Sequence, residues 1–223
     1  MEKPSRVYGN VYLIGSAEIS HPYDCLVYLI DLDELILVDT GAGLSYQRLL
    51  ENVVYLGFKP ERITTILVTH AHIDHIGALN QFKEHLGCKI IAHNKDSEAI
   101  ESGSGTGADV YGIDYIPCPV DIKLLKSEEQ IKIGNQQFNI VHIPGHTPGS
   151  IAIYLDLEGK RILFGQDIHG PYLSKWGADP IQAKSSLKKL MQLKADILCE
   201  GHFGIFQPAA EVEQYIKEYF DAL

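Results

Sequence analysis

The sequence has few cysteines, little positive charge and no long apolar run, and each shortage excludes a class of protein. Its four cysteines, at 25, 88, 118 and 199, lie far apart and form no CxxC pair. This spacing excludes a zinc ribbon and a disulfide framework, and we expect reduced, mostly buried thiols. No apolar run approaches the ~20 residues of a membrane-spanning helix, and the first residues lack the apolar core of a secretory signal. We therefore expect a soluble, cytoplasmic protein with no membrane partner.

Positive charge is scarce, because 19 Lys and Arg stand against 29 Asp and Glu, a formal net charge of -10. A protein that binds the phosphate backbone of a nucleic acid needs clustered Lys and Arg. The one basic run, which begins at Lys184, reads more simply as the solvated face of a helix. We therefore expect a small-molecule substrate and no nucleic-acid partner. The sequence leaves open whether the protein is a homo-oligomer.

The chain alternates between strand and helix patterns without a linker or a low-complexity segment. Apolar runs such as ELILVD, ITTILV and KRILFGQ predict strands, and amphipathic stretches at 45–57 and 76–86, each followed or ended by a turn residue, predict helices. The 223 residues suffice for a sizeable core. One α/β domain spanning residues 1–223 fits this pattern best.

The most informative stretch is Thr69-His70-Ala71-His72-Ile73-Asp74-His75, directly after the apolar run ITTILV. A strand that ends in such a cluster aims several ligands at one point. Imidazole and carboxylate together suit zinc, iron, manganese or nickel, and they suit calcium less well. An isolated HxH on a solvated turn would mean little, but here an Asp joins the cluster and further histidines follow downstream. The stretch predicts a metal site.

Three more apolar runs end at a residue that can bind a metal. These residues are His146, Asp167 and His202. Gly145 and Gly201 each precede a histidine and give the backbone freedom to turn the side chain inward. Because loops at one edge of a sheet carry chemistry on a rigid scaffold, we expect all four strand ends to converge. Asp39 follows the run ELILVD; it is either an ordinary turn carboxylate or the partner that orients a metal-binding histidine.

In the order LILVDTG, THAHIDHIGAL, PGHTPGS, FGQD and terminal GH, the sequence resembles the metallo-β-lactamase-fold hydrolases over nearly its whole length. The resemblance implies an αββα sandwich of two mixed β-sheets flanked by helices. It also implies that His70, His72 and His146 hold one metal ion and that Asp74, His75 and His202 hold a second. The carboxylate of Asp167 would bridge the two.

Such a pair of divalent ions, with zinc the first expectation and iron or manganese as alternatives, can share a hydroxide that attacks a substrate at neutral pH. Asp74 would be the catalytic residue that orients this hydroxide and relays its proton. We therefore expect hydrolysis of a small ester, thioester or lactone. The PGHTPGS stretch looks most like glyoxalase II, although Phe203 stands after His202 where an acidic residue is common in that group.

Two other reactions stay open within the family. Persulfide dioxygenases resemble this sequence as well, and in such an enzyme His70, His146 and Asp167 would hold a single non-haem iron. Retention of His75 and His202 favours two metals over one. A nucleic-acid-processing relative is the third alternative, and the acidic charge argues against it.

Several residues near the predicted ligands are candidates for the substrate pocket. His169 and Tyr172 follow Asp167 closely, with a Gly-Pro turn between them, and we expect both at the pocket wall. Trp176 fits core packing slightly better, and His21 and Tyr23 are weaker candidates. The Gly- and Pro-rich segment 102–121 is typical of a binding loop or lid. We assign His93, at the end of another strand, a structural role.

Overall fold

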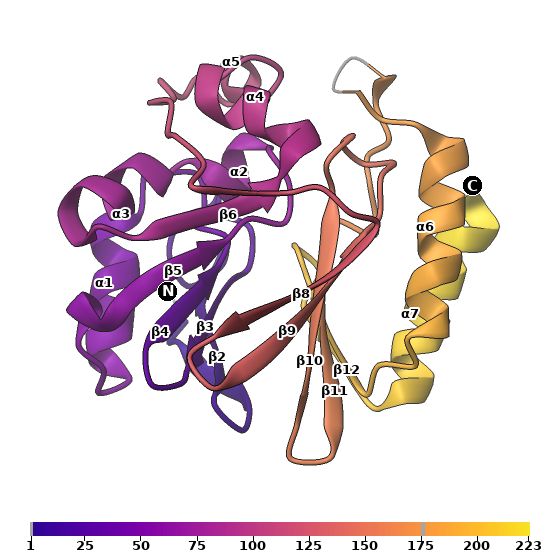
Figure 1. Ribbon diagram of the computed structural model, residues 1–223, viewed down its shortest axis with the longest axis horizontal. Helices are drawn as coiled ribbons and strands as arrows, with labels where there is room; N and C mark the ends of the chain where they lie inside the picture. The colour runs from indigo at the N-terminus through magenta and orange to yellow at the C-terminus, as the bar shows by residue number, and fades with distance from the viewer. Residues whose placement is uncertain (1, 175–176) are drawn as a thin grey trace. The chain divides into compact units, whose positions relative to one another are not determined.

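The computed structural model describes residues 2–174 and 177–223 (Figure 1). Backbone contacts divide the chain into two compact units, Met1–Leu124 and Leu125–Leu223. Each unit has a mixed sheet with helices against it, in agreement with the predicted α/β class. That residues 1–223 form one domain stays a prediction, and Trp176 lies outside the described residues.

The described residues of the first unit contain one seven-stranded sheet in the order β1-β2-β3-β4-β5-β6-β7. Neighbours pair antiparallel from β1 to β4 and parallel from β4 to β7. Every residue of β4 is buried, as expected for a central strand that is covered on both faces. The strands are β1 (Ser5–Tyr8), β2 (Val11–Gly15), β3 (Val27–Asp31), β4 (Leu35–Val38), β5 (Ile63–Leu67), β6 (Lys89–His93) and β7 (Ile122–Leu124).

Helices α1 and α3 lie along one face of this sheet (Figure 1). Leu49 of α1 and Phe82 of α3 are fully buried in the core of this unit. The predicted helix at 76–86 is interrupted at residues 77–78, where Gly77 donates its N–H to the carbonyl of Gly41 and the carbonyl of His75 accepts the N–H of Thr40. An added Cβ on Gly77 would come within 2.1 Å of the backbone of Ala42. The helical segments are α1 (Tyr46–Tyr55), the 3-10 turn η1 (Pro60–Arg62), α2 (Ile73–Ile76), α3 (Leu79–Leu86), α4 (Asn94–Ser102) and α5 (Ala108–Tyr111).

The described residues of the second unit contain a six-stranded sheet in the order β13-β12-β11-β10-β9-β8. All neighbours pair antiparallel except β11 and β12, which are parallel. Helices α6 and α7 run side by side along this sheet (Figure 1) and bury Leu187, Leu190 and Ile216 in its core. The elements are β8 (Glu128–Ile133), β9 (Gln136–His142), β10 (Ile151–Leu157), β11 (Lys160–Gln166), α6 (Pro180–Gln192), β12 (Ile197–Glu200), β13 (Ile205–Phe206) and α7 (Ala209–Ala222).

Strand direction explains where the polar residues gather in each unit. In the first unit, β4, β5 and β6 are parallel neighbours. The segments that carry Asp39, His70 and Asp96 therefore leave the sheet at the same edge. In the second unit, β9, β11 and β12 run in one direction, and the segments that carry His146, Asp167 and His202 follow their ends. The carboxyl ends of parallel strands are a common place for ligand sites.

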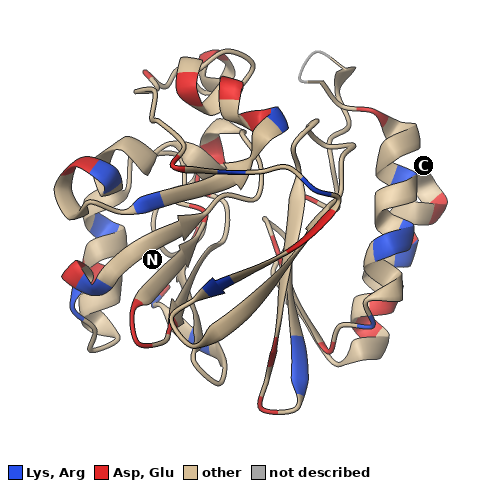
Figure 2. Cartoon of the chain, viewed as in Figure 1, with Lys and Arg blue, Asp and Glu red and all other residues tan. Residues whose placement is uncertain are grey.

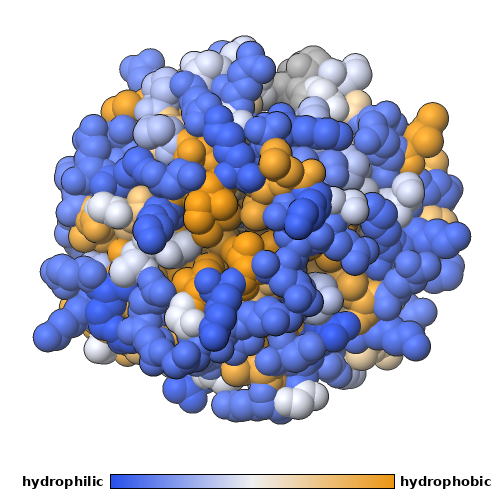
Figure 3. All heavy atoms as spheres, viewed as in Figure 1, coloured by the Kyte–Doolittle hydropathy of each residue, from blue (hydrophilic) through white to orange (hydrophobic). Residues whose placement is uncertain are grey.

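Charged residues of both signs are interspersed on both units, and basic residues lie along α6 (Figure 2). On the face shown in Figure 3, hydrophilic residues cover most of the surface and apolar residues appear in separate patches. Within the described residues, no helix is both long and apolar enough to cross a membrane.

Candidate metal centre

The cluster predicted from the sequence follows β5 and enters α2. His70 and His72 precede the helix, and Asp74 and His75 lie in it. All four side chains are buried, with exposed fractions of 7% or less. His70 Nε2 lies 3.0 Å from His72 Nδ1, and His75 Nε2 lies 3.8 Å from an oxygen of Asp74. The local sequence thus concentrates four potential ligands in one buried turn.

Asp39 orients one of these histidines. Its Oδ2 accepts hydrogen bonds from His75 Nδ1 at 2.7 Å and from the Thr69 hydroxyl at 2.6 Å, and its Oδ1 accepts the Thr69 N–H at 2.8 Å. The backbone of Asp39 has φ 61°, a left-handed conformation that is uncommon for residues other than Gly and is associated with functional strain. With Nδ1 bonded to Asp39, His75 can offer Nε2 to a metal ion.

A second buried carboxylate, Asp96 in α4, supports the backbone of the same turn. Its Oδ2 accepts the N–H of Ala71 at 2.9 Å, and Ala71 lies between the two histidines of the HxH pair. The turn is held from another side by Thr40, whose N–H and hydroxyl both bond the carbonyl of His75. These contacts fix the backbone of the turn, so the direction of each histidine ring depends on its side-chain rotamer.

In the second unit, Asp167 lies between two histidines. One of its oxygens, Oδ2, is 3.4 Å from His146 Nε2 and 3.4 Å from His202 Nε2. The β11–β12 register shifts between Phe164 and Gln166, and Gln166 has φ 54°. This irregularity turns the chain at the end of β11 just before Asp167.

Two glycines give these side chains their room. A Cβ on Gly201 would lie 2.0 Å from Asp167 Oδ1, so only glycine leaves the carboxylate in its place. Gly145 has φ 144°, and a Cβ there would lie 2.4 Å from the backbone of Ala183 in α6. Both glycines directly precede a histidine of the site, as the sequence pattern indicated.

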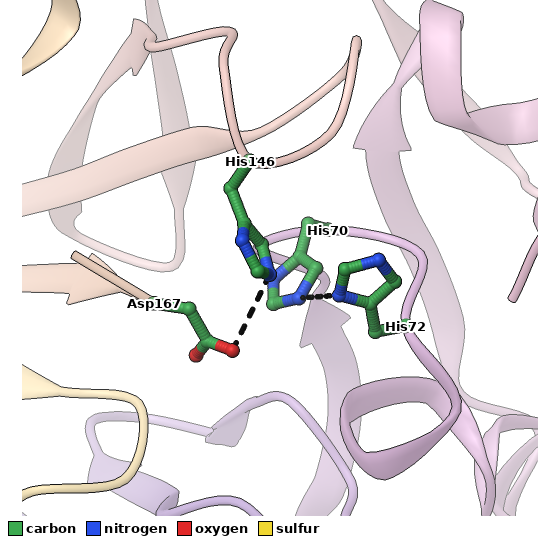
Figure 4. A group of neighbouring side chains, drawn as sticks. All are labelled: His70, His72, His146 and Asp167. Atoms are coloured by element: carbon green, nitrogen blue, oxygen red, sulfur yellow. Dashed lines mark hydrogen bonds and ion pairs between the residues drawn. The ribbon is translucent and has the colours of Figure 1, made fainter. Parts of the chain in front are cut away.

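The predicted ligands fall into two groups in which all ligand atoms lie within 4.8 Å of one another. One group is His70, His72, His146 and Asp167 (Figure 4), and the other is Asp74, His75, Asp167 and His202. Ligand atoms about 3.4 Å apart are what a tetrahedral ion with bonds of about 2.0–2.2 Å requires. The observed separations of 3.0 Å and 3.4 Å are close to this value. The two groups share Asp167 and are buried except for the partly exposed His202, and they suit a dinuclear metal site.

Cys25, Asp39 and His75 form a third group of close polar atoms. Burial is the main cause that raises the pKa of the Cys25 thiol, to about 12. A protonated thiol is a poor metal ligand, and Asp39 and His75 already bond each other. We therefore assign this group to the support of His75.

The residues predicted at the pocket wall differ in what their polar atoms do. The Tyr172 hydroxyl donates to the Ile168 carbonyl at 2.8 Å, and the Tyr172 ring lies 6.1 Å from that of His146. His169 Nδ1 lies 2.9 Å from Glu200 Oε1. His21 and Tyr23 contact each other edge to face, and Tyr23 contacts Tyr111 of α5 in the same way. That these side chains bind substrate stays a prediction.

The segment 102–121 is irregular apart from the last residue of α4 and the short helix α5. The carbonyl of Thr106 accepts the N–H of Ile73 at the start of α2. The segment thus contacts the metal-binding turn directly, while its role as a lid stays a prediction. His93 accepts the N–H of Lys95 through Nδ1 and caps α4. This contact agrees with the structural role assigned to His93.

Sequence reasoning missed three buried carboxylates. Asp96 supports Ala71, and Glu200 supports the turn that carries His202. Asp24 accepts the N–H of Ala42. Burial raises the pKa of Asp24, and its hydrogen bonds with Ser20, Ser45 and Ala42 lower it by less. The only sequence signal for Asp96 and Glu200 was their position just after a strand or at its end, and a single carboxylate there is too common to be diagnostic.

Comparison with known proteins identifies the family. The model of the metallo-beta-lactamase superfamily matches residues 22–202, a range that contains every residue of the two ligand groups. A probable metallo-hydrolase of Methanocaldococcus jannaschii is 29% identical over 188 residues, which are 81% of this chain and 88% of that protein. A hydroxyacylglutathione hydrolase of Haemophilus influenzae is 28% identical over 146 residues, which are 65% of this chain and 66% of that protein.

Among solved structures, the subclass B3 metallo-beta-lactamase of Bradyrhizobium japonicum superimposes with a TM-score of 0.85 at 22% identity, over 99% of this chain and 92% of that one. This similarity confirms the predicted αββα fold. The chain therefore belongs to the metallo-beta-lactamase superfamily.

Proposed function

We propose that the protein is a dinuclear metal-dependent hydrolase that cleaves a small ester, thioester or lactone. The observation that carries the proposal is the sharing of Asp167 by two complete groups of ligands, which are buried except for the partly exposed His202. A one-metal enzyme has no need of the second group, in which Asp74, His75 and His202 accompany Asp167. The name of the Haemophilus influenzae relative, a hydroxyacylglutathione hydrolase, favours thioesters within this class.

His70, His72 and His146 would hold one ion, Asp74, His75 and His202 would hold the other, and Asp167 belongs to both groups. Zinc fits the imidazole and carboxylate donors, and iron and manganese also accept them. When bound, two such ions would supply an activated water at neutral pH and polarisation of the substrate carbonyl.

The side chains then have separate tasks. Asp74 is buried in the first turn of α2, and we assign it the orientation of the attacking water and acceptance of its proton at a carboxylate oxygen. Asp39 holds the ring of His75 in one tautomer through Nδ1. The strands behind these turns keep the groups rigid, which limits the reorganisation that the reaction requires.

The test is a substrate panel with the purified, metal-loaded protein. Thioesters of glutathione and of another thiol carrier, a simple ester and a lactone are each incubated with and without a chelator. We expect chelator-sensitive release of acid from at least one thioester. Oxygen consumption with a persulfide, together with no hydrolysis in the panel, would contradict the proposal and favour a persulfide dioxygenase that uses His70, His146 and Asp167.

A further inference from the structure

Helices α6 and α7 carry opposite charges on one surface of the second unit. Helix α6 contains three lysines and no acidic residue, a net charge of +3. Helix α7 contains four acidic residues and one lysine, a net charge of -3. All four acidic residues of α7 are exposed, and these are Glu211, Glu213, Glu218 and Asp221. Because the two helices lie side by side on the same sheet (Figure 1), basic and acidic stripes run next to each other.

Two hollows lie between these helices, one at each end of the pair. The start of α6 and the end of α7 line a hollow of about 340 Å³, whose walls include Ile181, Phe220 and Leu223. The end of α6 and the start of α7 line a hollow of about 350 Å³, whose walls include Met191 and Ile216. In both hollows the start of one helix accompanies the end of the other, so the helices are antiparallel.

The outer side of α6 is where an apolar residue has no cover from the chain itself. Ile181 is 85% exposed, more than any other large apolar residue that the structure describes. The inner side of α6 is already occupied, because Leu187 is buried and the Ser186 hydroxyl donates to the Pro144 carbonyl at 2.7 Å. Since Ile181 adjoins the apolar walls of the first hollow, it belongs to a patch and is not an isolated surface residue.

We propose that the outer surface of α6 and α7 binds the same surface of a second copy of this chain, in a dimer with two-fold symmetry. A two-fold axis parallel to the helices sets α6 of each copy on α7 of the other, as in a four-helix bundle. The charged stripes then face their opposites, and Ile181 of each copy packs against the end of α7 of the other. The inference depends on neither metal binding nor hydrolysis.

The register of the dimer follows from the packing within one copy. Lys184 Nζ lies 5.0 Å from the centre of the Phe220 ring, which sets these two residues at the same height along the helices. An axis parallel to the helices keeps every residue at its own height. Lys184 of one copy therefore comes close to Asp221 of the other. Lys188, one helical turn further along α6, comes close to Glu218.

The balance of charge selects a second copy over other occupants. Two chains with a net charge of -10 repel each other over most of their surfaces, so they can meet only where the local charges cancel. The helix pair is such a place, because its charges of +3 and -3 add to zero. An anionic membrane would be attracted by α6 but repelled by α7. A rotated copy of the same surface satisfies both helices at once.

The apolar part of the surface is tested by sedimentation equilibrium of the full chain, which measures the Kd of the dimer. Ile181→Asp should raise Kd by at least about tenfold, because it removes an apolar contact at two equivalent places. An Asp in the first turn of a helix favours the helix, so the variant should stay folded. Leu125→Asp changes another strongly exposed apolar residue and is the matched control, which should keep the Kd of the wild type.

A charge exchange tests the register. Lys188→Glu and Glu218→Lys each set like charges opposite each other, and each should raise Kd by about tenfold or more. The double variant again sets opposite charges against each other, so its Kd should return close to that of the wild type. Lys132→Glu, at an exposed position of β8, is the control for a change of total charge and should have little effect.

Four results would overturn the inference and leave the proposed function standing. The first is a wild-type chain that stays monomeric at every concentration. The second is a dimer that Leu125→Asp dissociates and Ile181→Asp does not, because the interface then lies elsewhere. The third is a double variant that dimerises no better than the two single ones. The fourth is a monomer that binds vesicles of phosphatidylglycerol and phosphatidylcholine through Lys184 and Lys188, which would assign the surface to an anionic lipid.

Discussion

The buried carboxylate of Asp39 accepts three hydrogen bonds, and we expect its replacement to lower metal affinity. Asp39→Asn keeps the size of the side chain but replaces an acceptor oxygen by an N–H₂ group, which cannot accept from both Thr69 and His75. Loss of such a partner of a metal-binding histidine typically lowers metal affinity by about 10–100-fold. We expect that decrease in a competition titration against a chelator. Unchanged affinity, matching the exposed control Asp109→Asn, would show that Asp39 is only a turn residue.

Gly201 offers a second test at the level of one residue. Gly201→Ala places a methyl group 2.0 Å from the present position of Asp167 Oδ1, so the carboxylate must move. Because Asp167 belongs to both ligand groups, we expect metal atoms per chain to fall to about half of the wild-type value or less. The control is Gly159→Asn in the β10–β11 turn, where nothing lies near an added Cβ and Asn tolerates the positive φ. If Gly201→Ala binds as many metal atoms per chain as the wild type, the shared role of Asp167 is contradicted.

The residues of the site were predictable to the extent that their pattern is rare. Four ligands within six positions and two Gly-His pairs are uncommon, and the structure places all of these residues in the two ligand groups. The supporting carboxylates Asp96 and Glu200 were not predictable, because their roles depend on which backbone N–H lies opposite them in the folded chain. The sequence leaves the role of Asp39 open for the same reason.

At the scale of elements, Phe82 joins α3 to the core of the first unit. It is fully buried and meets Tyr46 of α1 edge to face at 4.9 Å. Phe82→Ala should lower the free energy of unfolding by about 3–5 kcal/mol, the usual cost of removing a buried aromatic ring. Phe82→Leu keeps more of the volume and should cost less than about 1.5 kcal/mol. Urea denaturation measures both, and equal midpoints for the two variants would contradict this packing.

The sequence predicts the central strands and the long amphipathic helices correctly, but it does not predict the marginal elements. The run ELILVD became β4, and the pattern at 45–57 became α1. Strand β1, whose first two residues are exposed, has no alternation to detect, and β13 has only two residues. The break between α2 and α3 lies where Gly77 donates its N–H to the carbonyl of Gly41, which is far away in the sequence, so local periodicity cannot reveal it.

At the scale of the whole molecule, the balance of charge argues against a polyanionic substrate. The net charge is -10, and the basic residues are interspersed with acidic ones (Figure 2). We expect no retention of RNA at physiological salt, since such binding depends on neutralising several phosphates. A filter-binding assay at two salt concentrations measures this. Tight binding that weakens steeply with salt would favour a nucleic-acid-processing enzyme.

The measurement that tests the central claim most directly is elemental analysis of the purified protein as metal atoms per chain. Two ligand groups that share Asp167 predict about two divalent ions per chain, with zinc expected. About one iron per chain would contradict the dinuclear assignment and point to the mononuclear dioxygenase. If no metal binds even after supplementation, the account of this site is wrong.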